Sequence, residues 1–298
     1  MAGKMCRSTA SLGWLLSAIA AFNSVSCDRT RGDVLQPPTE LVDVYAEFPA
    51  WSPNGDLIAL YYKGDGSIPT GVWLLSLSSG NARFLSGGDQ PSWSPNGTKL
   101  AMSRNAHIVV VTLDSGESSE LTWSGRSFGT SWSPDGALLA YDRIDPADSS
   151  GIWIMKADGS EKRLASPDSL RARSPSWSPD GEWIACSAYA SSETPHLHLM
   201  RIDGSEVRRV GNTPSGEYYP RWSPDGAYIA VTTHDGIRLF HVDSGEWRHL
   251  SATFQERLES RQTCSWSPDA TELVYNREYL WAIHRDGTEN RVLPWQHE

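Results

Sequence analysis

The chain has 298 residues, a formal net charge of −10 at pH 7 and 39% hydrophobic residues. Nucleic-acid binding calls for a basic face, so this acidic balance argues against a nucleic-acid partner. The length is sufficient for one large globular core.

The first 26 residues have the pattern of an export signal. Lys4 and Arg7 precede an apolar stretch from residue 12 to residue 22, and the small residues Ser24 to Ser26 form a cleavage pattern. This apolar stretch is shorter than the roughly 20 residues that a membrane-spanning helix needs. We therefore predict a signal peptide over residues 1–26 and an exported mature chain.

Cys27 directly follows this segment and allows two interpretations. It is either the lipidated first residue of a bacterial lipoprotein or an ordinary residue after a cleavage site, and the leucine usual three positions before a lipidated cysteine is absent. We favour lipidation, because the polar stretch up to residue 43 suits a tether between a lipid anchor and a folded domain. The predicted organisation is a signal peptide at 1–26, a tether at 27–43 and one domain at 44–298.

That domain carries six copies of one short motif. The copies read WSPNG, WSPDG or WSPDA and begin at Trp51, Trp93, Trp132, Trp177, Trp222 and Trp266. Successive tryptophans are 39 to 45 residues apart, which is the period of a β-propeller blade with about four short strands. We predict an all-β fold, a six-bladed β-propeller of four-stranded antiparallel meanders.

The motif itself predicts a hairpin. Serine, proline, Asp or Asn, and glycine suit the four positions of a type I turn, and apolar strands such as residues 57–61 and 138–142 follow it. A second glycine turn after each third strand leads into a short fourth strand. The sixth copy has Ala270 in place of glycine, which either costs about 1 kcal/mol in a left-handed conformation or marks a different turn.

The repeat also predicts how the blades pack. Large aromatics at fixed repeat positions are expected to fill the spaces between blades. Cys186 and Cys264 fall two blades apart, so we predict two small buried residues and no disulfide. Ring closure stays open at this point, because residues 41–45 either pair with the last blade as an extra strand or belong to the tether.

These motifs resemble the repeats of TolB-like, or WD40-like, β-propellers of the bacterial envelope. The resemblance covers all six repeats and implies a non-enzymatic, monomeric module that binds an envelope protein or peptide in the periplasm or beside a membrane. TolB itself has a further N-terminal α/β domain, which residues 27–44 are too short to form. The full TolB role is therefore not implied.

Topology predicts where such a module binds. The first and third connections of each blade are tight turns, whereas the second connections and the links between blades are longer, and binding residues commonly lie on long loops. We therefore expect a binding site at the long-loop face and the channel mouth. The predicted binding residues are Phe48, Gln90, Phe128, Arg173, Tyr218, Tyr219, Arg261 and Gln262.

Signals of catalysis are lacking. The sequence has no GxSxG elbow, Walker phosphate loop, HExxH motif or paired CxxC motif, so we predict no catalytic residue and no cofactor. His107, His196, His198 and His234 fall on third strands or their approaches, away from the axis, and we predict no metal site. The alternative hypothesis is a glycan-binding protein or a polyuronate lyase that acts at the channel mouth.

Overall fold

A computed structural model describes residues 46–64, 68–145, 150–189, 194–250, 262–277 and 279–297. The predicted signal peptide, Cys27, the tether, the strand at 41–45 and Arg261 lie outside the described residues. Within the described ranges, the structure contains no helix with the length and apolarity needed to cross a bilayer.

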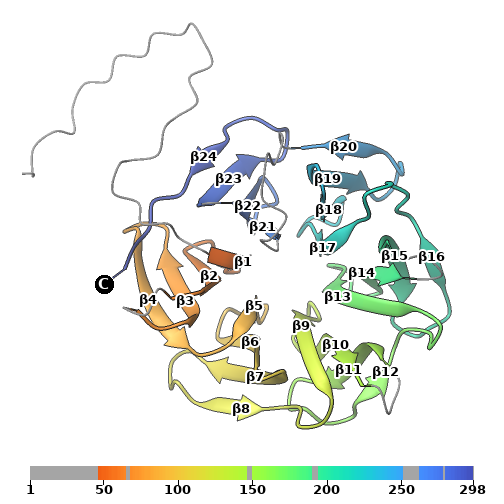
Figure 1. The fold of residues 1–298 in the computed structure, drawn as a ribbon, viewed down its shortest axis with the longest axis horizontal. Helices are drawn as coiled ribbons and strands as arrows, with labels where there is room; N and C mark the ends of the chain where they lie inside the picture. The colour runs from red at the N-terminus through yellow and green to blue at the C-terminus, as the bar shows by residue number, and fades with distance from the viewer. Residues whose placement is uncertain are drawn as a thin grey trace, which may run out of the picture. The chain divides into compact units, whose positions relative to one another are not determined.

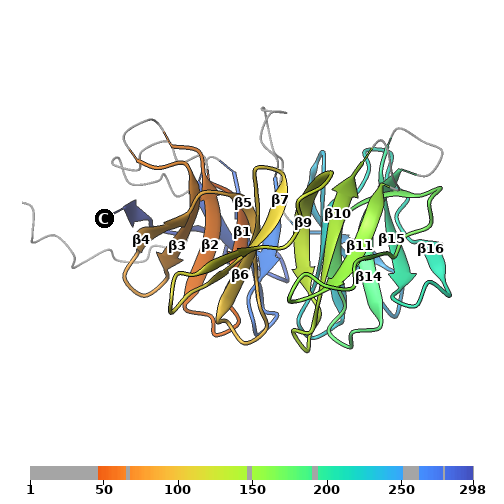
Figure 2. The ribbon, with the colours of Figure 1, turned by 90° about the horizontal axis from the view of Figure 1, so that it is seen from below.

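Six sheets, each with four antiparallel blade strands, surround a central axis (Figure 1), and Figure 2 shows the same strands from the side. Blade 1 contains β1 (Ala46–Trp51), β2 (Leu57–Tyr62), β3 (Gly71–Ser76) and β4 (Asn81–Ser86). Blade 2 contains β5 (Asp89–Trp93), β6 (Lys99–Arg104), β7 (His107–Thr112) and β8 (Ser118–Glu120). Blade 3 contains β9 (Arg126–Trp132), β10 (Leu138–Ile144), β11 (Gly151–Lys156) and β12 (Arg163–Leu164).

The other three blades repeat this order. Blade 4 contains β13 (Arg171–Trp177), β14 (Trp183–Tyr189), β15 (His196–Arg201) and β16 (Val207–Arg209). Blade 5 contains β17 (Tyr218–Trp222), β18 (Tyr228–Thr233), β19 (Gly236–His241) and β20 (Trp247–His249). Blade 6 contains β21 (Cys264–Trp266), β22 (Glu272–Asn276), β23 (Leu280–His284) and β24 (Arg291–Val292). The predicted all-β, six-bladed propeller is confirmed.

Each motif forms the predicted tight turn between the first two strands of its blade. In the fifth copy the backbone N–H of Gly226 donates to the carbonyl of Ser223 at 2.9 Å. The hydroxyl of Ser223 donates to Asp225 at 2.5 Å and accepts from the backbone N–H of Tyr228 at 2.9 Å. The motif serine thus joins both sides of the turn, which explains its presence in every copy.

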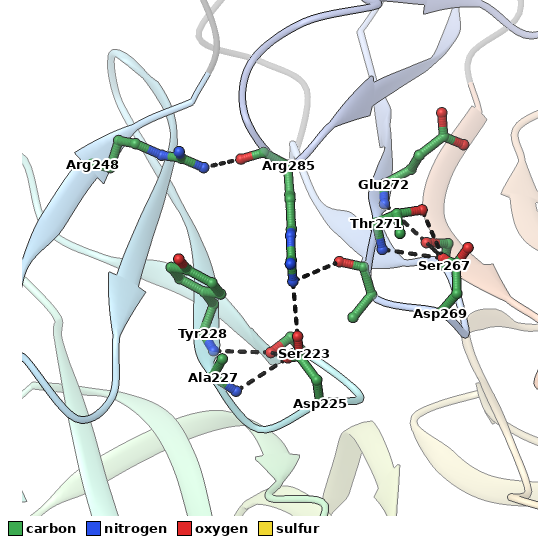
Figure 3. A network of polar contacts seen from close by, with 11 residues as sticks. Ser223, Asp225, Ala227, Tyr228, Arg248, Ser267, Asp269, Thr271, Glu272 and Arg285 are labelled. Carbon is green, nitrogen blue, oxygen red and sulfur yellow. Dashed lines mark hydrogen bonds and ion pairs between the residues drawn. The ribbon is translucent and has the colours of Figure 1, made fainter.

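The sixth turn has the same form although alanine replaces glycine. Ala270 has φ of 59°, and its N–H donates to the carbonyl of Ser267 at 2.9 Å, so the left-handed alternative is correct. Figure 3 shows Arg285 beside this turn, where its guanidinium donates to Asp225 of blade 5 at 2.8 Å and to the Ala270 carbonyl at 3.4 Å. Arg285 thereby links the turns of blades 5 and 6.

The motif tryptophans pack between blades as predicted. The indole N–H of Trp93 donates to the carbonyl of Ala50 in blade 1 at 2.9 Å, and that of Trp132 donates to Ser92 in blade 2 at 3.1 Å. Trp177 joins a buried cluster that also contains Ala140 and Ile152 of the preceding blade. The indole N–H groups of Trp93, Trp132 and Trp266 thus donate to the backbone of the preceding blade, whereas those of Trp177 and Trp222 are buried without a partner among the described residues.

The ring closes through the end of the chain. Beyond blade 6, β25 (Gln296–His297) pairs in parallel with β4, with Gln296 opposite Asn81, and the C-terminus lies beside β4 in Figure 1. Just before it, Trp295 is 8% exposed and belongs to a cluster shared by blades 1 and 6. The strand that follows blade 6 in the sequence thus pairs with the outer strand of blade 1 and joins the two ends of the propeller.

Cys186 and Cys264 are free and buried, as predicted. Burial raises the pKa of each thiol to about 12, which leaves very little of the reactive thiolate at neutral pH. In a Cys27→Ser variant we expect neither thiol to react with an aromatic disulfide reagent until denaturant unfolds the ring. Rapid reaction of the folded variant in a colorimetric assay would contradict the buried placement.

Candidate binding site in the central channel

The inner strands of five blades share an unusual backbone feature. Each contains a β-bulge three residues before its motif tryptophan. The bulged residues have φ between 49° and 54°, and they are Phe48, Gln90, Gly129, Ser174 and Tyr219. Left-handed non-glycine residues are uncommon and strained, and such strain gathers at functional sites.

These five positions surround the mouth of the channel at the long-loop end. They line one small cavity together with Pro91, Thr130, Pro175 and Arg221. The rings of Phe48 and Tyr219, from blades 1 and 5, meet edge to face at 5.9 Å. The bulges therefore place side chains from different blades around one opening, and Phe48 is 4% exposed there.

A wider cavity of about 450 Å³ occupies the other end of the channel, on the side of the tight turns. All six motifs contribute tryptophan, serine or proline to its wall. Pro91, Thr130, Pro175 and Arg221 line both cavities. We call the section at these four residues the throat.

Arg221 is the one charged residue among the described residues that line the two cavities. Arg221 is half-buried there, and burial lowers the pKa of its guanidinium. Asp142 on β10 is 6% exposed, and burial raises the pKa of its carboxyl to about 6, although the Arg173 and Arg221 charges act in the opposite direction. The Asp142 Oδ1 atom has no hydrogen-bond partner among the described residues.

Comparison of the blades shows that both charged residues are exceptions to the repeat. The residue before the motif tryptophan is Ala50 in blade 1, serine in four other blades and Arg221 in blade 5. Ten residues after the tryptophan, Asp142 of blade 3 is the only carboxylate among the six copies. Departures from a repeat that carry a buried charge are candidates for a role outside the repeat's packing.

The serine that Arg221 replaces has a structural task in other blades. The hydroxyls of Ser131, Ser176 and Ser265 each accept a hydrogen bond at 3.0 Å from the backbone N–H of the next blade's motif tryptophan. A guanidinium has no acceptor and cannot take over this bond. Blade 5 has therefore lost an interblade contact at the position where it gains a charge in the channel.

The predicted site residues divide into three groups. Phe48, Gln90 and Tyr219 line the mouth cavity, whereas Phe128, Arg173 and Tyr218 precede the bulges by one residue and are not part of its lining. Gln262 precedes β21, where no residue has the left-handed bulge conformation. The sequence-based reasoning missed Gly129, Thr130, Asp142, Ser174 and Arg221, and the unique charges at two repeat positions were the available signal for Asp142 and Arg221.

Two of the four histidines considered as metal ligands, His196 and His198, have other contacts. His196 Nδ1 lies 3.0 Å from Glu217 Oε2. Glu217 is fully buried and also accepts from the backbone N–H of Thr213 at 2.7 Å. Nδ1 of His198 lies 2.9 Å from the His196 carbonyl, and burial lowers the pKa of this ring. In the part of the chain that the structure describes, no three His, Cys, Asp or Glu side chains are grouped to hold a metal ion.

Comparison with known proteins agrees with this architecture. Residues 90–297 match the family model of the TolB β-propeller domain, which is more than half of the chain. The chain belongs to the TolB β-propeller family. No curated protein matches this family member at a significant level.

Solved structures of TolB proteins share the fold. TolB from Acinetobacter baumannii is 17% identical with a TM-score of 0.64, and the match covers 84% of this chain but only 63% of that one. A TolB candidate from Agrobacterium tumefaciens is 22% identical with a TM-score of 0.55, over 83% of this chain and 80% of that one. An oligogalacturonate lyase in complex with manganese is 16% identical with a TM-score of 0.56, over 80% and 75%.

Proposed function

We propose that this TolB-family propeller is a non-enzymatic binding protein of the bacterial cell envelope that holds a protein or peptide at its long-loop end and channel mouth. The ring of left-handed bulges carries the proposal, because it directs Phe48, Gln90 and Tyr219 from three blades toward one opening. Membership of the TolB family is consistent with protein binding.

The first residues extend the proposal to the protein's location. The signal pattern over residues 1–26 would export the chain, and lipidation of Cys27 would anchor it through the tether at residues 27–43. We expect radiolabelled palmitate to be incorporated into the wild-type protein and not into a Cys27→Ser variant. Equal labelling of the two proteins would contradict a lipid anchor on Cys27. Export does not depend on the anchor, so both proteins should be found in the cell envelope in either case.

Site-specific photocrosslinking in intact cells tests the binding surface. A benzophenone side chain at position 90 should capture a protein partner, because Gln90 lines the mouth cavity. The matched control places the same group at Trp123, which is 71% exposed and lines none of the cavities described here. A protein captured from position 90 alone supports the proposal, and capture from neither position contradicts it.

The alternative is a glycan-binding protein or a polyuronate lyase that acts at the channel mouth. The observation in its favour is the pair of guanidiniums near the throat, Arg173 and Arg221, since arginine binds carboxylates well. Ultraviolet absorbance of unsaturated products after incubation with polygalacturonate and manganese tests the lyase. If the wild-type protein forms unsaturated products and a chelator abolishes their formation, the lyase hypothesis replaces the binding proposal.

A further inference from the structure

One ring of residues surrounds the inner end of the wider cavity. The ring consists of the residue that precedes each motif tryptophan, and all six of these residues line the cavity: Ala50, Ser92, Ser131, Ser176, Arg221 and Ser265. Because they occupy the same repeat position in each blade, they lie at one level of the channel. Four hydroxyls and one guanidinium therefore surround the channel at this level.

The ring has hydrogen-bond donors that the described part of the chain does not use. The hydroxyls of Ser131, Ser176 and Ser265 each accept a bond from a tryptophan N–H, and none of the three donates one to a described residue. The Arg221 guanidinium donates to the carbonyl of Pro220 at 2.9 Å. No nitrogen of Arg221 is among the buried polar atoms that lack a partner in the described ranges, so its other donors are open to the channel.

No carboxylate among the described residues lines the wider cavity. The carboxylates of the inner strands Glu47 and Asp89 lie four residues before their motif tryptophans, and Asp142 is paired with Phe128 at the same level of blade 3. These three carboxylates therefore belong to the long-loop end, whereas the ring lies one residue before the tryptophans. An anion that enters from the tight-turn end reaches hydroxyl donors and a guanidinium, which bind carboxylates well.

The rest of the wall is mainly apolar. Three half-buried tryptophans line it, together with the six exposed motif prolines, and the tryptophans are Trp51, Trp93 and Trp222. The motif serines in the wall donate within their own turns, and they are Ser52, Ser178 and Ser223. The wall therefore offers apolar contact to a ligand whose charged end lies at the ring.

The size of the wider cavity suits an organic molecule. Its volume of about 450 Å³ lies within the range of small-molecule sites. The mouth cavity beyond the throat has a volume of about 10 Å³, which is room for about one water molecule. An organic ligand in the wider cavity therefore stays at the tight-turn end.

We propose that the wider cavity is a second binding site, which takes a small carboxylate with an apolar body from the tight-turn end. The carboxylate accepts hydrogen bonds from the Arg221 guanidinium and from serine hydroxyls of the ring, and the apolar body packs against the tryptophans and prolines. Blade 5 gives up an interblade hydrogen bond to place Arg221 in this ring, which provides independent support. The site does not depend on protein binding at the mouth.

Three ligands test the proposal by calorimetric titration of the full protein. They are 3-phenylpropionate, its neutral amide 3-phenylpropanamide, and acetate, which has the carboxylate without the phenyl group. We expect 3-phenylpropionate to bind about tenfold more tightly than either of the other two. Equal affinity for the acid and the amide would overturn the anion site, and equal affinity for the acid and acetate would overturn the apolar part. Absence of binding by the acid would overturn the whole proposal.

Three variants locate the ligand. Ser92→Leu should abolish binding, because Ser92 lines the wider cavity and not the mouth cavity, and a leucine there fills the space. Arg221→Gln should remove the preference for the acid over the amide. Arg238→Gln should retain it, since Arg238 pairs with Asp235 at 2.7 Å and lines neither cavity.

Unchanged affinity of a folded Ser92→Leu variant for 3-phenylpropionate would show that the ligand binds elsewhere, and the proposal would be wrong. Urea unfolding establishes whether that variant is folded. The comparison of the three ligands uses the unaltered protein, so it decides the class of ligand even if no variant folds.

Discussion

A Trp295→Ala variant should be less stable than the wild-type protein by about 3 to 5 kcal/mol, the usual loss for a buried tryptophan. The Trp295 ring meets that of Tyr62 edge to face at 5.2 Å, and both belong to the cluster that joins blade 1 to blade 6. Truncation leaves a cavity at the interface where the ring closes. Urea unfolding followed by tryptophan fluorescence measures the difference.

The matched control is Trp123→Ala, because Trp123 is 71% exposed. Substitutions at such surface positions usually change the free energy of unfolding by less than about 0.5 kcal/mol. A loss below about 1 kcal/mol for Trp295→Ala would show that the interface of blades 1 and 6 holds without this side chain.

An Asp142→Asn variant should be more stable than the wild-type protein at pH 7.5 and equal to it at pH 4. The folded-state pKa of Asp142 is raised to about 6, above the ordinary value near 4. Folding therefore favours the protonated carboxyl, and the stability that this proton supplies is lost as pH rises from about 4 to about 6. The shift corresponds to about 2 to 3 kcal/mol above that window.

Asparagine stays neutral throughout, so the difference between the two proteins isolates this carboxyl from all others. Urea unfolding at both pH values measures it. Asp243→Asn, at an exposed turn position, is the control and should show no such difference. If Asp142→Asn is no more stable than the wild-type protein at pH 7.5, the ionised Asp142 carboxylate does not destabilise the folded protein.

The architecture was predictable from the motifs because each motif favours one local structure, a tight turn between two strands. A Ser-Pro-Asp-Gly sequence selects one turn, and the strand predicted after it at residues 138–142 lies within the observed β10. The closing strand was not predictable in the same way. β25 has only two residues, Gln296 and His297, and its parallel pairing with β4 depends on the finished ring.

The candidate site was predictable only in part, because the bulges change the alternation of the inner strands. Regular pairing would direct every second side chain toward the same side, and one inserted residue reverses the direction from that point. Tyr219 therefore lines the mouth cavity while Tyr218 does not. The glycine at position 129 gave no chemical signal, although a β-carbon there would lie 2.6 Å from Asp142 Oδ1 and would displace that carboxylate.

The parallel strand β25 also sets an order of events during synthesis. Asn81 of β4 leaves the ribosome long before its partner Gln296. All six blades are therefore synthesised before β25 can pair with β4. Until then the outer edge of β4 is unpaired, as are the outer edges of β8, β12, β16, β20 and β24 in the closed ring, and an unpaired edge can pair with other chains. Because contacts so distant in sequence form slowly, we expect the pairing of β25 with β4 to be a late step in folding.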